Sequence, residues 1–190
     1  MDILSKIFGN SARNKIIRLF VFNPGIPFTT KEVRLRAKVS IEACRRELNL
    51  LSKVGMIKSR KNLKKGRVWE LDKNFTLTDD FRSLLNRDFL ERRKELVKKF
   101  KNCGQIKLLV ISGIFVEDSD SRIDLCLVGN KLKRGVIDNI IKTIEAELGR
   151  ELTYAVLDKE DFLYRVNTSD KFIRDIFDYP HRLIVDKLAF

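Results

Sequence analysis

Apolar residues recur at helical spacing in two stretches near the start of the chain. Residues 10–22 begin with the N-cap candidates Asn10 and Ser11 and end at the turn signal NPG. A second stretch begins at Thr29 or Thr30, either of which can cap a helix, and a glutamate follows in its first turn. We predict one helix in each stretch.

A further helix is predicted from Ser40 to Val54, and only a few residues around Val39 connect it to the helix before it. Isoleucine, cysteine and leucine recur along one side of this helix, and Gly55 follows it as a C-terminal cap. Two helices with so short a connection are typical of a helix-turn-helix pair. The opposite side of the second helix carries Glu42, Arg45, Arg46, Asn49 and Lys53.

Alternating apolar and polar residues after this helix predict two short strands. MIKSR, residues 56–60, and RVWEL, residues 67–71, are joined by KNLKKG into a hairpin in which Gly66 relieves the turn. We expect Trp69, on the second strand, to pack rather than to stack on a base. The hairpin carries the basic residues Lys58, Arg60, Lys61, Lys64, Lys65 and Arg67.

The second half of the chain has the pattern of a separate domain. Residues 77–101 predict one long helix or two, and beyond them strands and helices alternate in the manner of a small α/β or α+β domain. The predicted strands are 106–115, 122–129, ELTYAVLD and RLIVD, and the predicted helices are 135–148, DKEDFLYRV and SDKFIRDIFD. The fold class is therefore two domains, a mainly helical one at residues 1–76 and an α/β one at residues 104–190, joined by a helical connector at residues 77–103.

Charge is distributed unevenly between these two parts. Residues 1–75 hold 18 basic against 6 acidic residues, whereas residues 76–190 hold 21 against 20. This asymmetry favours a first module that binds a polyanion and a second module that is close to neutral.

The cysteines and the longest apolar runs indicate where the protein works. The three cysteines are far apart and form no CxxC pair, and no apolar run approaches the length of a membrane span. We therefore expect reduced, buried thiols in a soluble cytoplasmic protein with no membrane partner.

Residues 10–75 resemble the winged helix-turn-helix module of ArsR- and MarR-type transcriptional regulators. The segments that carry the resemblance are SARNKIIRLFVFNP, TTKEVRLRAKVSIEACRRELNLLSKVGMI and KSRKNLKKGRVWEL. The resemblance implies that the second helix of the pair enters the major groove of double-stranded DNA. It also implies that the hairpin, called the wing in such modules, runs along the phosphates or into the minor groove.

The residue types of this module suit those roles. Arg45 and Arg46 can hydrogen-bond to guanine or clamp phosphates, and Asn49 can pair with an adenine edge. Ser40 suits a phosphate at the helix N-terminus, whereas Glu42 repels phosphate and either accepts from cytosine or turns away. The alternatives are a solvated basic surface and an adaptor that binds an acidic protein. The expected DNA contacts are Thr30, Ser40, Glu42, Arg45, Arg46, Asn49, Lys58, Arg60, Lys61, Lys64, Lys65 and Arg67.

Residues 112–129, SGIFVEDSDSRIDLCLVG, resemble the signature loop of polymerase-β-like nucleotidyltransferases, with a resemblance that covers residues 104–190. In that family one strand ends in Gly-Ser and the next begins with Asp-x-Asp, whose carboxylates hold Mg²⁺ for phosphoryl transfer. Here Ile114 stands in place of the serine and Arg122 in place of the first aspartate, so only Asp124 remains.

These departures predict a catalytically inactive domain, a pseudoenzyme that needs no metal and no cofactor. Thr153 and Tyr154, the candidates for the third carboxylate position, carry none. The carboxylates of the intervening loop, Glu117, Asp118 and Asp120, are expected to be solvated. Gly113, Arg122 and Asp124 could form a vestigial site for a small phosphate-bearing effector, and the alternative role of the domain is a scaffold for dimerisation.

Together these patterns predict a homodimeric, DNA-binding transcriptional regulator with a nucleotidyltransferase-like second domain. Two further hypotheses remain open at this point. One is an active nucleotidyltransferase that modifies a protein or RNA, and the other is a non-catalytic adaptor for protein interactions.

Overall fold

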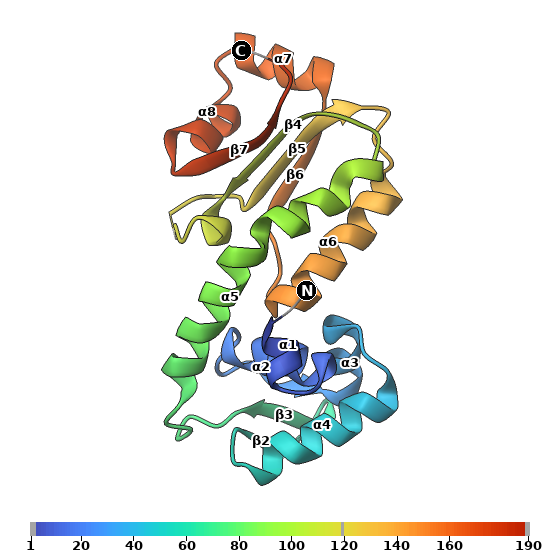
Figure 1. The fold of residues 1–190 in the computed structure, drawn as a ribbon, viewed down its shortest axis with the longest axis vertical. Coiled ribbons are helices and arrows are strands. Elements are labelled where there is room, and N and C mark those ends of the chain that lie inside the picture. Colours follow the sequence, from blue (N-terminus) through green and yellow to red (C-terminus); the bar gives the residue numbers. More distant parts are fainter. Residues whose placement is uncertain (1–2, 119, 189–190) are drawn as a thin grey trace. The chain divides into compact units, whose positions relative to one another are not determined.

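The computed structural model describes residues 3–118 and 120–188, without the side chains of residues 89–94, 96, 97 and 101. In this part of the chain there are eight α-helices and two β-sheets, coloured along the sequence in Figure 1. None of the helices in the described part is long and apolar enough to cross a membrane.

The chain divides into two compact units. The first comprises Met1–Arg92 together with Lys142–Glu151, and the second comprises Arg93–Ile141 together with Leu152–Phe190. Ten residues from the second half of the sequence therefore belong to the first unit, whereas the domain ranges expected from the sequence are contiguous.

The first unit consists of helices with a small antiparallel sheet. The sheet has the order β1-β3-β2, and β1 is too short to be predicted from a pattern of alternating residues. Helix α1 was not predicted either. The elements are α1 (Ile3–Ile7), α2 (Ser11–Val21), β1 (Phe28–Thr29), α3 (Thr30–Ala37), α4 (Ile41–Lys53), β2 (Ile57–Asn62), β3 (Gly66–Leu71) and the start of α5 (Thr78–Lys98).

Local hydrogen bonds explain where the helices of this unit begin. The Asn10 side chain accepts from the backbone N–H of Ala12 at 2.9 Å and caps α2. Helix α3 begins with a capping box, in which Thr29 and Glu32 each accept from the other's backbone N–H. Of the two predicted caps, Thr29 is therefore the one used.

Helix α4 is bounded at both ends as its sequence predicts. The Ser40 hydroxyl accepts from the backbone N–H of Ala43 at 3.2 Å. At the other end Gly55 has φ of +76°, its N–H donates to the carbonyl of Ser52, and the next N–H donates to the carbonyl of Leu51. These bonds form a Schellman motif, which ends the helix and turns the chain into β2.

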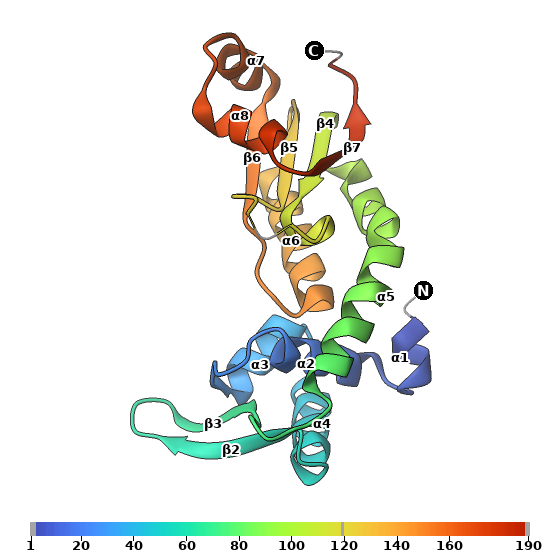
Figure 2. The same cartoon turned by 90° about the vertical axis from the view of Figure 1, so that its left-hand side faces the viewer.

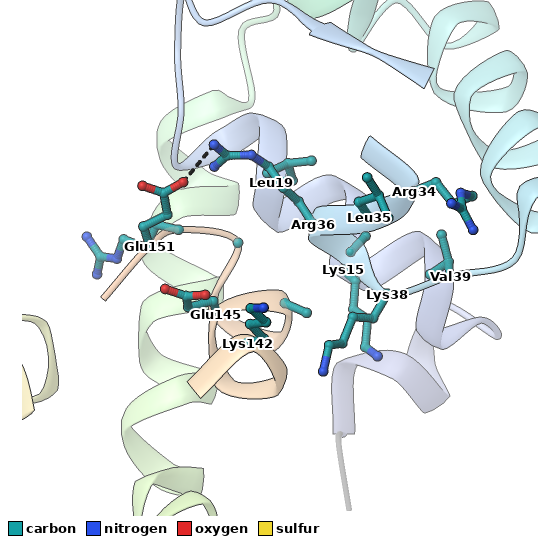
Figure 3. A pocket seen from close by; sticks show the side chains of 14 residues that line it. Lys15, Leu19, Arg34, Leu35, Arg36, Lys38, Val39, Lys142, Glu145 and Glu151 are labelled. Carbon is teal, nitrogen blue, oxygen red and sulfur yellow. Dashed lines mark ion pairs between the residues drawn. The ribbon is translucent and has the colours of Figure 1, made fainter. Parts of the chain in front are cut away.

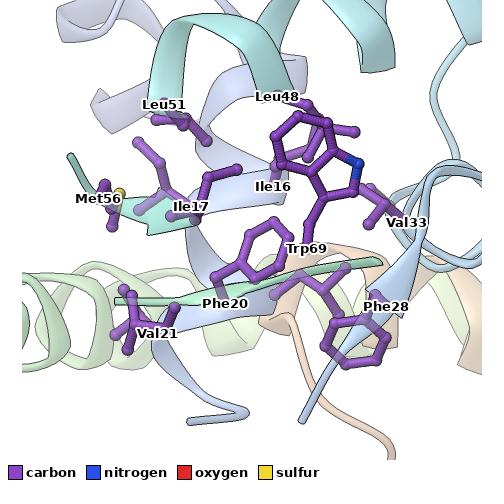
Figure 4. Packing of buried hydrophobic residues seen from close by; sticks show 14 of the residues in the cluster. Ile16, Ile17, Phe20, Val21, Phe28, Val33, Leu48, Leu51, Met56 and Trp69 are labelled. Carbon is purple, nitrogen blue, oxygen red and sulfur yellow. The ribbon is translucent and has the colours of Figure 1, made fainter. Parts of the chain in front are cut away.

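The core of the first unit forms around α2 and the face of α4 that packs against it (Figure 4). Ile16, Phe20 and Leu48 are at most 1% exposed. Trp69 on β3 is 4% exposed, which confirms that it packs in the core. The buried residues of α2 and α4 recur at the spacing of one helical face, as the sequence predicts.

The second unit is a four-stranded mixed sheet covered by helices. Strands β4 and β5 are antiparallel, β5 and β6 are parallel, and β7 pairs antiparallel with β4, so the order is β6-β5-β4-β7. The predicted order of strands and helices is confirmed. The elements after α5 are η1 (Lys99–Asn102), β4 (Gln105–Ser112), η2 (Gly113–Phe115), β5 (Leu125–Asn130), α6 (Arg134–Leu148), β6 (Tyr154–Asp158), α7 (Lys159–Asn167), α8 (Lys171–Asp178) and β7 (His181–Asp186).

Side chains alternate between the two faces of this sheet. Leu108 and Val110 of β4 pack in one cluster with Phe162 of α7 and Ile173 of α8. Figures 1 and 2 show α6 along the opposite face. Because both faces are covered, β4 and β5 read as continuous apolar runs rather than as alternating ones.

The cysteines are buried, as predicted. Cys44, Cys103 and Cys126 are free thiols. Burial raises the pKa of Cys126 to about 12. Such a thiol stays protonated at neutral pH and behaves as a small apolar side chain.

Candidate nucleic-acid interface

The polar side of α4 faces solvent. Arg45, Arg46 and Asn49 are exposed, while Cys44 and Leu48, on the packed side, are buried. Helical periodicity thus places the basic and amide groups on one accessible surface, with donors suited to base edges and phosphates. Glu42 and Lys53 are exposed on the same helix.

The start of α4 holds a negative charge. Glu42 accepts from its own backbone N–H and from the Ser40 hydroxyl, and these two hydrogen bonds together with Arg45 keep the pKa of its carboxyl below the usual range. The charged carboxylate therefore occupies the positive end of the helix dipole. A phosphate at Ser40 would have to compete with this carboxylate.

Glu47 of α4 is a further candidate residue that the sequence pattern does not single out. It is fully buried, and it accepts from Asn10 Nδ2 at 2.8 Å and from Arg13 Nε at 2.8 Å. Its other neighbour is Arg46, whose Nε lies 3.5 Å from Glu47 Oε1. Glu47 thus joins α4 to α2 and contacts a residue of the exposed basic surface. In the sequence, the indication of this role is that Glu47 lies on the apolar side of a helix, where a carboxylate requires a hydrogen-bonding or ionic partner.

The strands of the hairpin, residues 57–71, are longer than predicted and carry their basic residues on an exposed surface. Figure 2 shows the hairpin extending beyond the helices of the first unit. At its tip, the Asn62 side chain accepts from the backbone N–H groups of Lys64 and Lys65 at 2.9 and 3.0 Å. Leu63 at the tip is fully exposed. Such a tip can approach a polyanion without rearranging the rest of the unit.

Several of the hairpin cations have carboxylate partners within the chain. Arg60 Nε lies 3.1 Å from Glu70 Oε2, and Lys58 Nζ lies 3.7 Å from Asp72 Oδ1. These are partly exposed pairs, which solvent and salt weaken. Among the described residues, no ion pair joins Lys61 to a carboxylate.

Lys64, Lys65 and Arg67 differ in their environments. Lys65 Nζ lies 2.9 Å from Glu32 Oε1, and this bond, followed by the capping hydrogen bonds of Thr29, lowers the pKa of Glu32. Arg67 lies over the ring of Trp69 at 4.5 Å. Lys64 has no carboxylate partner in the described part of the chain, so it is available to a ligand together with Lys61.

Thr30 is turned toward the interior of the unit. Its hydroxyl accepts from Trp69 Nε1 at 3.2 Å, and it lies at the first residue of α3 rather than on the exposed side of α4. The other predicted contact residues lie on α4, at its N-cap Ser40 and on the hairpin.

The residues of the predicted vestigial site are only partly brought together. The Asp124 carboxylate accepts from the backbone N–H groups of Ile114 at 3.0 Å and Thr153 at 2.8 Å. Any side chain at position 113 would clash with this carboxylate, because a Cβ added to Gly113 would lie 2.3 Å from Asp124 Oδ1. Arg122 instead pairs with Asp175, at 3.1 Å from Nε to Oδ2.

This arrangement changes the predicted strand boundaries. Strand β4 ends at Ser112 and β5 begins only at Leu125, so the predicted strands 106–115 and 122–129 were too long on the loop side. The reason is that Gly113, with φ of +53°, starts a turn of 3₁₀ helix.

The loop carboxylates do not gather into a metal site. Among the described residues, no group of three or more His, Cys, Asp or Glu side chains is placed to hold a metal ion. Asp118 accepts from the hydroxyl and the N–H of Ser121, which lowers the pKa of its carboxyl, and this bond organises the loop itself.

Comparisons with known proteins identify no family for this chain. No family model matches it, and no curated protein matches its sequence. Among solved structures the chain is similar to a mutant of Lactococcus lactis ZitR, with a TM-score of 0.37 and 20% sequence identity. That match covers 49% of this chain and 63% of the ZitR chain, so less than two thirds of that protein is spanned. The function is therefore inferred from the residues of this chain.

Proposed function

We propose that the first unit is a winged helix-turn-helix module that binds double-stranded DNA, and that the protein is a transcriptional regulator. In this proposal α4 enters the major groove and the β2–β3 hairpin is the wing that contacts phosphates. The observation that carries the proposal is the exposed side of α4, where Arg45, Arg46 and Asn49 lie on a helix anchored by its opposite side.

The distribution of charge supports the same conclusion. Eighteen basic and six acidic residues lie in residues 1–75, and the hairpin that carries six of these basic residues extends beyond the helices of the first unit. Phosphate contacts of this kind supply affinity for any duplex, whereas base contacts supply preference for a sequence. The two groups of residues, on the hairpin and on α4, can therefore be tested separately.

Selection of bound fragments from sheared genomic DNA tests the proposal directly. A DNA-binding regulator is expected to enrich a small set of fragments that share a sequence. If no duplex binds even at low salt, the proposal fails and a protein-interaction adaptor is favoured instead.

Replacing Lys61 and Lys64 together with glutamine is expected to weaken binding to all duplexes alike. The slope of log affinity against log salt concentration is negative, and each phosphate contact contributes about 0.9 to its magnitude. Losing two contacts should therefore make the slope shallower by about 2. Fluorescence anisotropy over a series of salt concentrations measures this slope. The matched control replaces the exposed residues Lys171 and Lys187 of the second unit with glutamine, which should leave the slope unchanged.

The second unit is proposed to be a degenerate nucleotidyltransferase-like fold without catalytic activity, used for dimerisation or ligand sensing. Two observations support this. The Asp124 carboxylate is held by two backbone N–H groups, one of which belongs to Thr153, a residue just before β6 that carries no carboxylate. Arg122, at the position of the missing aspartate, pairs with Asp175.

Assays with labelled nucleoside triphosphates and Mg²⁺ or Mn²⁺ are expected to give no nucleotidyl transfer to protein or RNA. Replacing Asp124 with alanine should instead destabilise the second unit by about 1–2 kcal/mol, because two backbone N–H groups lose a charged acceptor. Thermal unfolding measures this change, with Asp120→Ala in the exposed loop as the control. Metal-dependent transfer that disappears in Asp124→Ala would contradict the proposal and establish an enzyme.

A homodimer in the cytoplasm completes the proposal. Two modules related by twofold symmetry would bind two half-sites, which multiplies sequence preference. Light scattering at several concentrations tests the dimer, since a monomer at all of them would exclude it.

A further inference from the structure

A cavity of about 540 Å³ lies in the first unit, with all its lining residues in α2, α3, the α3–α4 connection and residues 142–151 (Figure 3). Its volume falls in the range of small-molecule binding sites. The cavity lies apart from the exposed side of α4 and from the hairpin, because neither contributes a lining residue.

Basic side chains predominate around this cavity. Six lining residues are basic and two are acidic, and the basic ones come from three separate segments of the chain. The basic residues are Lys15, Arg34, Arg36, Lys38, Lys142 and Arg150, and the acidic ones are Glu145 and Glu151.

Only some of these cations have carboxylate partners. Arg36 Nη2 lies 2.7 Å from Glu151 Oε1, the pair drawn as a dashed line in Figure 3. In the described part of the chain, no ion pair joins Lys15, Arg34 or Lys142 to a carboxylate. The cavity therefore has an excess of positive charge that internal pairs do not neutralise.

The cavity also has an apolar wall. Leu19 of α2, Ala37 of α3 and Ala146 of α6 line it and are almost fully buried. A ligand that matches this lining has an apolar body as well as negative charge.

The segment 142–151 is held firmly against α2 and α3. Lys38 Nζ donates to Thr143 Oγ1 at 2.9 Å, and Asn23 Nδ2 donates to the carbonyl of Gly149 at 2.6 Å. Gly149 approaches α2 so closely that an added Cβ would lie 2.3 Å from the carbonyl carbon of Arg18. The cavity wall is thus built by specific contacts.

The site predicted around Arg122 offers much less space. The cavity beside Arg122 and Asp175 has a volume of about 10 Å³, which holds at most one water molecule. A phosphate-bearing molecule with an organic body would not fit there without rearrangement.

We propose that the 540 Å³ cavity of the first unit is a binding site for a small phosphate-bearing molecule with an apolar body. A phosphate monoester carries a charge of about −1.5 to −2 near neutral pH, so it can satisfy several cations at once, whereas a monocarboxylate carries a single charge. Arginine and lysine form strong charge-assisted hydrogen bonds to phosphate oxygens. The proposal concerns ligand binding and does not depend on DNA binding.

Titration with 1-naphthyl phosphate, a fluorescent phosphate monoester with an apolar body, tests the site in the full-length protein. Saturable binding is expected, with weaker binding of inorganic phosphate, which lacks the apolar body, and of 1-naphthol, which lacks the charge. If 1-naphthol or inorganic phosphate binds as tightly as 1-naphthyl phosphate, the assigned ligand class is contradicted. No saturation below about 10 mM would overturn the site.

Two variants locate the binding. Replacing Lys15 and Lys142 with glutamine should weaken 1-naphthyl phosphate about tenfold, because two charge-assisted contacts are lost at partly exposed positions. The matched control replaces Lys31 and Lys73, which are exposed and do not line the cavity. Equal affinity in the two double variants would place the ligand elsewhere. Ala146→Leu, which adds three carbon atoms to the apolar wall and narrows the cavity, should weaken binding while circular dichroism stays unchanged, and unchanged affinity there would also overturn the site.

Discussion

Replacing Asp88 with alanine is expected to lower the free energy of unfolding of the first unit by about 3–5 kcal/mol. Asp88 of α5 forms an ion pair with Arg18 of α2, and the two side chains are 6% and 1% exposed. Arg18 also donates to the backbone carbonyl of Leu85 at 3.0 Å. Without the Asp88 carboxylate, the charged guanidinium of Arg18 stays buried but loses an ion-pair partner. The free-energy cost of burying this charge then favours the unfolded state.

Urea unfolding followed by the fluorescence of Trp69 measures this effect, because the chain has a single tryptophan and it lies in the core of the first unit. Asp79→Ala is the matched control. Asp79 pairs with Arg82 on the same helix, but its side chain is 88% exposed. Asp79→Ala should therefore lower the free energy of unfolding by no more than about 1 kcal/mol. A double variant that replaces Arg18 with methionine and Asp88 with leucine should recover most of the stability. Similar losses for Asp88→Ala and Asp79→Ala would show that the buried pair contributes little.

Replacing Arg46 with alanine is expected to weaken binding to the selected DNA sequence by about 5- to 150-fold, which corresponds to one lost base contact. Arg46 lies on the exposed side of α4, and its side chain is 67% exposed although its Nε lies near Glu47. Sequence preference should relax at one base position. Binding to unrelated duplexes should change much less, because the hairpin phosphate contacts remain.

Anisotropy titrations with the selected duplex and with a scrambled duplex separate these effects. Lys64→Ala should weaken both duplexes by the same factor, whereas Arg46→Lys should keep the charge and lose the preference, since lysine lacks the planar bidentate donor. An equal loss on both duplexes in Arg46→Ala would assign Arg46 to a phosphate. Unchanged binding in both Arg46→Ala and Lys64→Ala would exclude this surface as the DNA interface.

The sequence predicted α4 in detail because its determinants are local. The packed and exposed sides follow from the helical period, and the ends follow from Ser40 and Gly55, whose hydrogen bonds reach only a few residues along the chain. The hairpin and the order of the strands in the second unit also follow from apolar runs and turn residues that are adjacent in sequence, whereas the ends of β4 and β5 beside the Gly113 turn differ from the prediction.

Other features depend on partners that are far apart in sequence. The buried charge of Glu47 is balanced by a hydrogen bond from Arg13, 34 residues away in sequence. The buried charge of Arg18 is balanced by Asp88, 70 residues away. A carboxylate in an apolar stripe signals that some partner is needed, but it does not say which one. Residues 142–151 likewise read as the end of an amphipathic helix, and only contacts such as Asn23 with Gly149 assign them to the first unit.

The sequence by itself thus determined the order of the elements apart from α1 and β1, the two sides of α4 and the basic residues of the hairpin. Period, capping and charge are properties of neighbouring residues, so they can be read along the chain. Only the tertiary structure decided that Asp124 is held by backbone N–H groups, that Thr30 faces Trp69, and that the basic cavity forms from three separate segments. The reason is that burial and ion pairing depend on which distant residues the fold brings within a few ångströms of each other.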